Sequence, residues 1–374
     1  ESIPGLSLWL DATNVDGKQN TTLSFSNPVS EWKDLSGNSK NLTQSESQRR
    51  PHLIGNSLNK MPVVRFDGIK SSDGDYLKNN HGLQISGELS IFLVTNKSSY
   101  GGAYEKILAI RGSDGKHGHL ISEGPSPNNF YVYASTPSGG YTNIIDTNSL
   151  SGALITNSIL GDGEISISIS GRLIGKKSHN YPVNGNEVLT LGWAYGSEYW
   201  DGDIAEVLVF NKKITEQQKI NVNYYLSKKW ELTSSMDSDA DGFLDNIDSN
   251  PTSCDVIKPN KMGTSWYARN GGSSQTLNVC TRVQVKGCGN SKWSDLGETV
   301  CKNFYHAHYH GPMFQTPSNV KDLSNINTFR VYRVDPGNYN YGCLVKESST
   351  DANWSTVNTS HTSDCVSGSL TNLN

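Results

Sequence analysis

Cysteine is absent from the first 253 residues of this chain of 374 residues. An even number of cysteines confined to one region predicts disulfide bonds formed in an oxidising compartment. No two cysteines are spaced as Cys-x-x-Cys, which argues against a structural zinc site. Six cysteines allow many pairings, but full pairing requires the first of them to bridge into the region that holds the other five. The six residues are Cys254, Cys280, Cys288, Cys301, Cys343 and Cys365.

Charged residues are also few, at 18% of the chain, and the formal net charge is only −4. This balance does not favour a nucleic-acid partner, which requires a strongly basic surface. Glycine, serine, asparagine and threonine are abundant instead. Such a composition is typical of extracellular β-rich proteins with many turns.

Long apolar runs are missing, so the sequence contains no membrane span, and no signal peptide begins at Glu1. We therefore expect that a leader or anchor has been removed and that the protein is extracellular or at the cell surface. Its expected partner is a glycan or another ligand on a host or neighbouring cell.

The motifs of several enzyme classes are absent as well. The chain has no Gly-x-Ser-x-Gly, no His-Glu-x-x-His and no glycine-rich phosphate loop. These absences favour a binding protein without catalytic residues. A carboxylate pair for glycoside hydrolysis stays open as an alternative, because its spacing is set in space and not along the sequence.

Residues 1–232 contain many short segments in which apolar and polar residues alternate, separated by turn residues. Alternation of this kind predicts strands, for example at 6–10, 63–66, 89–94 and 165–169. Apolar residues recur at helical spacing only after Thr215, which is a suitable helix cap, and continue to Trp230. The pattern predicts a mainly β protein whose first domain is an antiparallel sandwich.

Four segments of this domain resemble the concanavalin A-like, laminin-G-like jelly-roll family that is common in bacterial surface proteins. They are Leu-Trp-Leu-Asp-Ala at 8–12, Trp-Lys-Asp-Leu-Ser-Gly-Asn at 32–38, Pro-Val-Val-Arg-Phe-Asp-Gly at 62–68 and Gly-Asp-Ile-Ala-Glu-Val-Leu-Val-Phe at 202–210. The helix that ends in Leu-Ser-Lys-Lys-Trp at 226–230 is also typical of the family. The resemblance implies two antiparallel sheets and, in many members, carbohydrate binding.

The segment 233–254 contains twelve residues with the spacing of a calcium loop. Carboxylates stand at loop positions 1, 3, 5, 9 and 12, and Gly242 stands at position 6, where the loop must turn tightly. The predicted Ca²⁺ ligands are the side chains of Asp237, Asp239, Asp241, Asp245 and Asp248 and the carbonyl of Phe243. The alternative is a solvated acidic linker.

Residues 237–251 resemble a single thrombospondin type 3 calcium repeat that ends at Pro251. In that family such loops are structural linkers, so the resemblance implies a structural Ca²⁺ that fixes the arrangement of the flanking domains. The chain departs from the family in having one repeat and no array. Asp248 at the last position also has a shorter reach than the Glu of calcium-sensor loops.

Residues 255–374 are expected to form a small β-rich domain tied by disulfides, and no family resemblance is found there. Its sharpest feature is the sequence His306-Ala-His308-Tyr-His310. In one strand covering 304–310, all three imidazoles would share a face, as in some transition-metal sites. Three such positions span too long a distance for one ion unless the strand bends, so a histidine-rich binding face is the alternative.

Aromatic residues between strands of the first domain are the candidate ligand contacts. They are Trp193, Tyr195, Tyr199 and Trp200, with Asp201 beside them, and a second loop at 100–104 carries Tyr100 and Tyr104. Aromatic faces stack on sugar rings and carboxylates bind sugar hydroxyls. The alternative for each tryptophan is a place in the core.

Together these features predict a secreted or surface-displayed, lectin-like bacterial adhesin with a structural calcium site. The alternatives are a secreted carbohydrate-active enzyme and a large pilus-associated structural subunit.

Overall fold

The computed structural model describes residues 4–253, apart from 70–72, 98–101, 112–117, 125–128, 136–139, 147–150, 181–182, 186, 241–243 and 249. The side chains of 86 and 183–185 are not described either. From residue 261 onward it describes the backbone of eight strands, β19 to β26, without their side chains. The chain divides into two compact units, Glu1–Ser238 and Asp239–Asn374.

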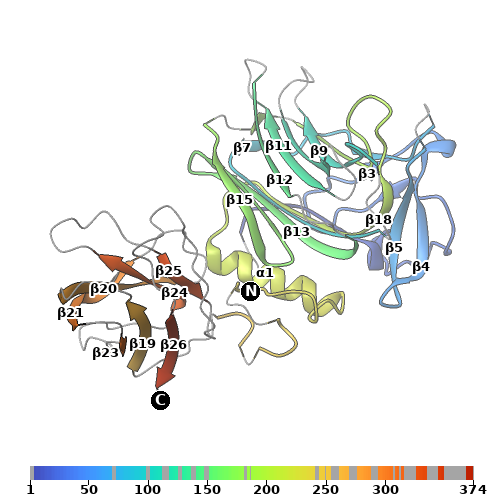
Figure 1. Ribbon diagram of the computed structural model, residues 1–374. Helices are drawn as coiled ribbons and strands as arrows, with labels where there is room; N and C mark the ends of the chain where they lie inside the picture. Colours follow the sequence, from blue (N-terminus) through green and yellow to red (C-terminus); the bar gives the residue numbers. More distant parts are fainter. Residues whose placement is uncertain are drawn as a thin grey trace. The chain divides into compact units, whose positions relative to one another are not determined.

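The first unit is a sandwich of two antiparallel sheets (Figure 1). In the first sheet the strands lie in the order β15-β14-β13-β8-β18-β5-β4, and β1 also pairs with β18. Its members are β1 (Leu6–Asp11), β4 (His52–Leu58), β5 (Met61–Asp67), β8 (Leu89–Lys97), β13 (Gly152–Gly161), β14 (Glu164–Ile169), β15 (Arg172–Ser178) and β18 (Asp201–Phe210).

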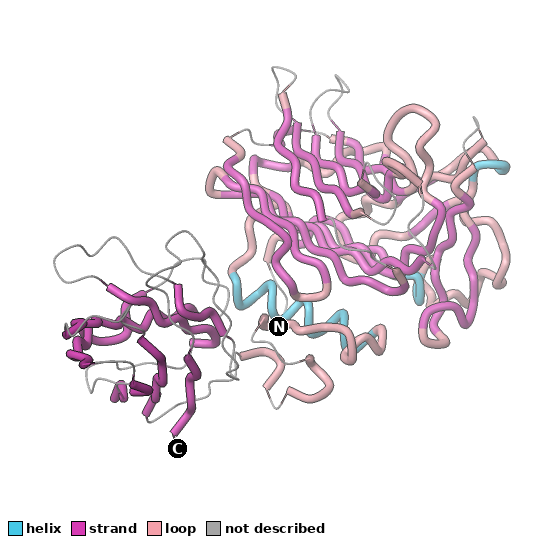
Figure 2. The backbone as a smooth tube through the Cα atoms, viewed as in Figure 1, coloured by secondary structure: helices cyan, strands magenta, loops and turns pink. Residues whose placement is uncertain are grey.

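The second sheet has the order β12-β11-β10-β9-β17-β6-β3-β2. Its members are β2 (Glu31–Trp32), β3 (Leu42–Thr43), β6 (Leu77–Asn79), β9 (Lys106–Arg111), β10 (Gly118–Glu123), β11 (Phe130–Ser135), β12 (Tyr141–Asp146) and β17 (Val188–Leu191). A separate pair joins β7 (Ile85–Gly87) to β16 (Val183–Gly185), and two short 3-10 helices cover Ala12–Asn14 and Ser47–Arg49. Figure 2 shows how strands dominate this unit.

The predicted strands at 6–10, 63–66, 89–94 and 165–169 are confirmed, as is the antiparallel sandwich. The sandwich also agrees with the fold that the jelly-roll resemblance implied.

Helix α1 (Glu216–Lys229) follows the last strand of the sandwich and packs against the face of the first sheet that is turned away from the second sheet (Figure 1). It begins as predicted, because the hydroxyl of Thr215 accepts from Gln218 N at 3.2 Å and Gln218 Oε1 accepts from Thr215 N at 2.9 Å. Among the described residues, no helix is both long and apolar enough for a membrane span.

The position of α1 explains the composition of the central strands. Residues 89–95 of β8 and 203–210 of β18 are all buried, since the first sheet is covered by the second sheet on one face and partly by α1 on the other. A strand covered on both faces tends to be apolar without alternation, although β18 also buries the charged residues Asp203 and Glu206. In β11, by contrast, buried and partly exposed residues alternate, because only one of its faces meets the core.

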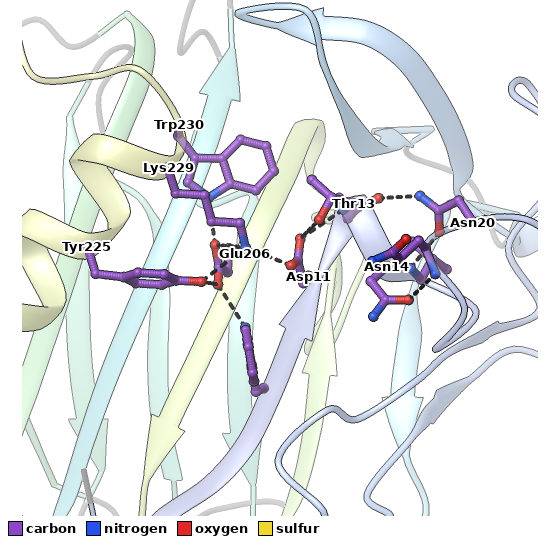
Figure 3. Close-up of polar contacts among 12 residues, drawn as sticks. Asp11, Thr13, Asn14, Asn20, Glu206, Tyr225, Lys229 and Trp230 are labelled. Atoms are coloured by element: carbon purple, nitrogen blue, oxygen red, sulfur yellow. Dashed lines mark hydrogen bonds and ion pairs between the residues drawn. The ribbon is translucent and has the colours of Figure 1, made fainter. Parts of the chain in front are cut away.

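A polar network joins α1 to the first sheet, with the buried carboxylate of Glu206 at its centre (Figure 3). Glu206 Oε1 accepts from Trp9 Nε1 at 2.8 Å and from Tyr225 OH at 3.0 Å. Its Oε2 accepts from Trp230 Nε1 at 2.6 Å and lies 2.8 Å from Lys229 Nζ. Burial raises the pKa of Glu206, while the neighbouring Lys229 ammonium lowers it.

Lys229 extends the network to the first strand, because its Nζ lies 2.6 Å from Asp11 Oδ2 (Figure 3). Three of the segments that carry the family resemblance therefore meet at one place. Trp9 and Asp11 come from 8–12, Glu206 from 202–210, and Lys229 from 226–230. Packing of the helix on the sandwich therefore accounts for these residues of the three segments.

The second unit contains two small antiparallel sheets. One is built from β19 (Lys261–Ala268), β22 (His308–His310), β23 (Met313–Gln315) and β26 (Gly368–Leu373). The other has the order β21-β20-β24-β25 and contains β20 (Thr276–Gly287), β21 (Ser294–Tyr305), β24 (Ile326–Val334) and β25 (Leu344–Ser348). A β-rich second domain is thus present.

The strand register of the sheet that contains β20 and β21 suggests one disulfide, because Cys280 of β20 lies directly opposite Cys301 of β21. Directly opposed residues of antiparallel strands have Cα atoms about 4.5–5.5 Å apart, within the range that a disulfide bridges. We therefore predict a Cys280–Cys301 bond. Peptide mapping by mass spectrometry without reductant should recover the two cysteines in one linked peptide. Linkage of Cys280 to any other cysteine would contradict the prediction.

This pairing would leave Cys254 to join one of Cys288, Cys343 and Cys365. All four lie outside the described residues.

Candidate functional site

Five tyrosines form a continuous surface on the second sheet and the loops beside it, and we call them the tyrosine surface: Tyr104, Tyr131, Tyr133, Tyr141 and Tyr195. The alternation of β11 creates its centre. Phe130, Val132 and Ala134 point into the core, which places Tyr131 and Tyr133 on the opposite face.

The same face carries a small apolar cluster separate from the main core. It consists of Ala109 on β9, Leu120 on β10 and Ala194, with Tyr133 packed against it. The ring of Tyr133 thus rests on an apolar patch of smaller side chains.

The rings touch one another in sequence. Tyr104 meets Tyr131 edge-on with centroids 6.2 Å apart, and Tyr131 is stacked with Tyr133 at 6.2 Å. Tyr133 then meets Tyr141 at 5.4 Å. Tyr141 is 61% exposed, Tyr195 44% and Tyr104 39%, so a ligand can reach them from solvent. Exposed aromatic residues gathered in one patch are characteristic of an interaction site.

Two cations hold Tyr195 and Tyr104 in place. Lys106 Nζ lies 5.2 Å from the centroids of both rings, and its charge is matched by Glu198 Oε2 at 2.7 Å. The guanidinium carbon of Arg111 lies 5.0 Å from the Tyr195 centroid, and Arg111 Nη1 donates to Ala194 O at 2.7 Å. Cation–π contacts of this kind stabilise the ring orientation before any ligand arrives.

The hydroxyls of Tyr131 and Tyr195 remain protonated at neutral pH. Burial raises the pKa of Tyr131, and its neighbours Tyr141, Tyr133 and Tyr104 raise it further, although a hydrogen bond with Asn143 lowers it. Burial likewise raises the pKa of Tyr195. A neutral phenol both donates and accepts hydrogen bonds, which suits a ligand rich in hydroxyl groups.

A second aromatic group lies along the same loop, between β17 and β18. Trp193 is stacked with Tyr199 at 6.1 Å and meets Tyr76 at 5.4 Å, while the guanidinium of Arg49 lies 5.5 Å from the Tyr76 centroid. Tyr76 and Tyr199 are buried, so only the partly exposed Trp193 has a surface available to a ligand.

Of the residues predicted as ligand contacts, some are accessible to a ligand and others are buried. Tyr195 belongs to the tyrosine surface, Trp193 is partly exposed beside it, and Tyr199 is buried beneath Trp193. Trp200 is fully buried, with Lys97 Nζ 4.6 Å from its ring, so its prediction as a ligand contact is wrong and its place is in the core. Asp201 is an exposed residue at the start of β18.

Sequence reasoning missed Tyr131, Tyr133 and Tyr141. A signal existed in Phe-Tyr-Val-Tyr-Ala-Ser at 130–135, where two tyrosines alternate with apolar residues as expected for one face of a strand. Of the second suggested loop, Tyr104 belongs to the tyrosine surface, while Tyr100 lies outside the described residues.

The calcium loop is described in part. Asp239 and Asp245 are buried, and a turn forms where Asp248 N donates to Leu244 O at 3.0 Å. Asp241 and Phe243 lie outside the described residues. Among the residues that are described, no group of three metal-ligating side chains is assembled. The donor set of carboxylates and one carbonyl is nevertheless the chemistry that Ca²⁺ requires.

The first residue of the loop lies tightly against the sandwich. Gly171, in the turn between β14 and β15, has φ +86°, and a Cβ there would stand 1.7 Å from Asp237 O. Only glycine permits this approach of the two backbones.

The histidine cluster is not built on one strand, contrary to the prediction for 304–310. β21 ends at Tyr305 and β22 begins at His308, and the two strands belong to different sheets. His308 and His310 stand two residues apart in β22, whereas His306 lies outside the described residues.

Neither a protein-family model nor a curated protein matches this chain. Among solved structures it is similar to domain 4 of AbnA, an extracellular GH43 arabinanase from Geobacillus stearothermophilus, in complex with arabinotriose. The TM-score is 0.36 at 14% identity, over 51% of this chain and 96% of that chain.

A Ruminococcus gnavus sialidase CBM40 bound to α2,3 sialyllactose gives a TM-score of 0.32 at 10% identity, over 37% of this chain and 84% of that one. The binding domain of botulinum neurotoxin serotype G gives 0.40 at 14% identity, over 88% and 72%. Similarity at this level carries no weight for the ligand of this chain, which must be inferred from its own residues.

Proposed function

We propose that the first unit binds carbohydrate through the tyrosine surface. The observation that carries the proposal is the contact series of Tyr104, Tyr131, Tyr133 and Tyr141 on a sheet face that does not meet the core. An outer face without a ligand would ordinarily be polar along these strands.

Carbohydrate is favoured over an apolar ligand by the chemistry of the surface. Tyrosine combines an apolar ring, which packs on the C–H face of a sugar, with a hydroxyl that hydrogen-bonds to sugar hydroxyls. Asn143 beside Tyr131 and the Arg111 guanidinium beside Tyr195 add further polar groups. The rings extend over β11, β12 and the loops before β9 and after β17, which supports binding of more than one sugar unit.

A glycan array probed with the full chain tests this proposal. Binding to a defined set of oligosaccharides, competed by the same sugars in solution, is the expected result. The proposal would be contradicted if the chain bound no glycan on the array, or if millimolar concentrations of the free sugar did not compete with the binding.

The proposal includes no catalytic step. The paired carboxylates Glu105 and Glu123 are buried and lie 2.6 and 2.8 Å from Lys97 Nζ, where they neutralise a buried ammonium and are shielded from a substrate. A reducing-sugar assay on the glycans bound in the array should accordingly show no release of product. Time-dependent release would favour a carbohydrate-active enzyme instead.

At the level of the whole chain, we propose a secreted or surface-displayed bacterial adhesin in which Ca²⁺ stiffens the segment between the two units. The aspartates of 237–248 repel one another unless a cation neutralises them. A bound Ca²⁺ would hold the loop in one conformation through its carboxylates.

Removal of Ca²⁺ should therefore expose this segment to protease. We predict that EDTA accelerates cleavage within 235–253 by at least about tenfold, because local opening then costs less free energy. Limited proteolysis followed by mass spectrometry measures the rate and the cleavage sites. Excess Ca²⁺ should restore protection, whereas Mg²⁺ should restore it poorly, since it prefers a smaller octahedral site. Cleavage unchanged by EDTA would contradict the calcium linker.

A further inference from the structure

A polar cleft with a volume of 680 Å³ opens on the first unit, away from the residues of the tyrosine surface. The start of β1, the segment between β2 and β3, the segment between β6 and β7 and the residue after β18 contribute to its walls. The side chains used below are Asn38, Lys40, His81, Gln84 and Asn211. Pockets for small ligands typically measure roughly 300–1,000 Å³.

Lys40 supplies a fixed positive charge to the wall of this cleft. Its Nζ donates to Leu83 O at 2.6 Å and to Ser7 Oγ at 3.3 Å, which leaves the third N–H of the ammonium for another acceptor. Burial lowers the pKa of Lys40, while the charge of Asp34 raises it.

No described carboxylate forms an ion pair with Lys40. The nearby Asp34 is engaged by backbone groups, since Oδ1 accepts from Trp9 N at 3.0 Å and Oδ2 from Lys40 N at 2.9 Å. A partly buried cation without a direct ion-pair partner is costly, and a bound anion would lower that cost.

The other walls offer hydrogen-bonding groups that the protein itself does not use. The side chains of His81, Gln84 and Asn211 make no hydrogen bond to any described residue. Asn38 is held rigidly, because its Nδ2 donates to Leu6 O at 3.0 Å and to Ser7 O at 3.2 Å. Its Oδ1 makes no hydrogen bond to a described residue and is left as an acceptor. Amides and an imidazole around one cation suit a ligand with one anionic group and several hydroxyls.

We propose that this cleft is a second binding site, for a small hydroxylated carboxylate of the acidic-sugar class. Lys40 and His81 bind the carboxylate, and the amides of Asn38, Gln84 and Asn211 bind the hydroxyls. The cleft shares no residue with the tyrosine surface. Binding in the cleft and binding on the tyrosine surface can therefore be tested separately.

Isothermal titration of the full chain with sodium glucuronate tests the site, with glucose as the matched neutral sugar. Glucuronate should bind and glucose should bind at least about tenfold more weakly, because a charge-assisted hydrogen bond contributes that much to affinity. Lys40→Gln should weaken glucuronate binding about tenfold or more, and its fold is checked by circular dichroism. His81→Ala, at an exposed position, provides a second variant that should also weaken binding.

Lys18→Gln removes an exposed lysine elsewhere and should leave the affinity unchanged, as should the double variant Tyr131→Ala/Tyr133→Ala. Absence of glucuronate binding, equal binding of glucose, or an affinity unaffected by both Lys40→Gln and His81→Ala would overturn the inference. A normal response of the cleft together with loss of glycan binding in the tyrosine variant would show that the two sites are separate.

Discussion

Replacing Glu206 by alanine should lower the free energy of unfolding of the first unit by about 3–5 kcal/mol, the usual cost of breaking a buried ionic network from one side. The indoles of Trp9 and Trp230 and the hydroxyl of Tyr225 would lose their acceptor. The ammonium of Lys229 would lose one of its two carboxylates and keep Asp11. The largest cost is expected at Trp230, because it is fully buried and its unpaired indole N–H would carry a desolvation penalty.

Chemical denaturation, followed by tryptophan fluorescence, measures this change. Glu206→Gln should lower the stability less than Glu206→Ala, because the amide oxygen of the glutamine still accepts a hydrogen bond. It is still destabilising, because a neutral amide no longer balances the charge of Lys229. Glu164→Ala removes an exposed ion pair with Lys176 and is the matched control, expected to cost less than about 1 kcal/mol. Equal stability of Glu206→Ala and Glu164→Ala would contradict the role assigned to the network.

Replacing Tyr131 and Tyr133 together by alanine should weaken glycan binding about 100-fold. Each ring stacked on a sugar contributes about 1–2 kcal/mol through buried apolar area and ring contacts, and two such losses combine to that factor. Stability should change much less than for Glu206→Ala, since both rings lie on the outer face and neither fills the main core.

Titration of the best glycan from the array into each variant measures this effect. Tyr131→Phe and Tyr133→Phe keep the rings and should lose only the part of the affinity that the hydroxyls provide. Phe25→Ala is the control, because Phe25 is 59% exposed but lies outside the tyrosine surface. An affinity of the double variant within about threefold of the wild type would place the ligand elsewhere.

Local patterns were sufficient to predict the framework of the first unit. Thr215 caps α1 as its sequence context indicates, and the alternation at 165–169 yields β14. Both depend on contacts close in sequence, such as the exchange of hydrogen bonds between Thr215 and Gln218. The network at Glu206 could not be predicted this way, because its partners Trp9 and Trp230 lie far away in the chain.

The candidate site was predicted only in part for the same reason. Tyr195 and Trp200 are five residues apart in one aromatic stretch, yet one is exposed and the other is in the core. Which side of the sheet each ring occupies depends on the bend between β17 and β18, and composition does not encode that bend. Tyr104 and Tyr131 became neighbours only through the pairing of β9, β10 and β11.

The prediction of one strand over 304–310 was wrong because strand propensity does not indicate where a chain passes from one sheet to another. His308 pairs with Ala268 in one sheet, whereas the preceding strand, ending at Tyr305, pairs with Thr276 in another. A continuous β-prone run was therefore a poor guide to a continuous face.

A crystal structure of the chain with its best-binding glycan would show directly whether the tyrosine surface holds the sugar. We expect a sugar ring within about 4 Å of Tyr131, Tyr133 or Tyr195, packed with its C–H face on a tyrosine ring. A glycan without an acidic sugar that bound on any other face of the first unit, or on the second unit, would contradict this proposal.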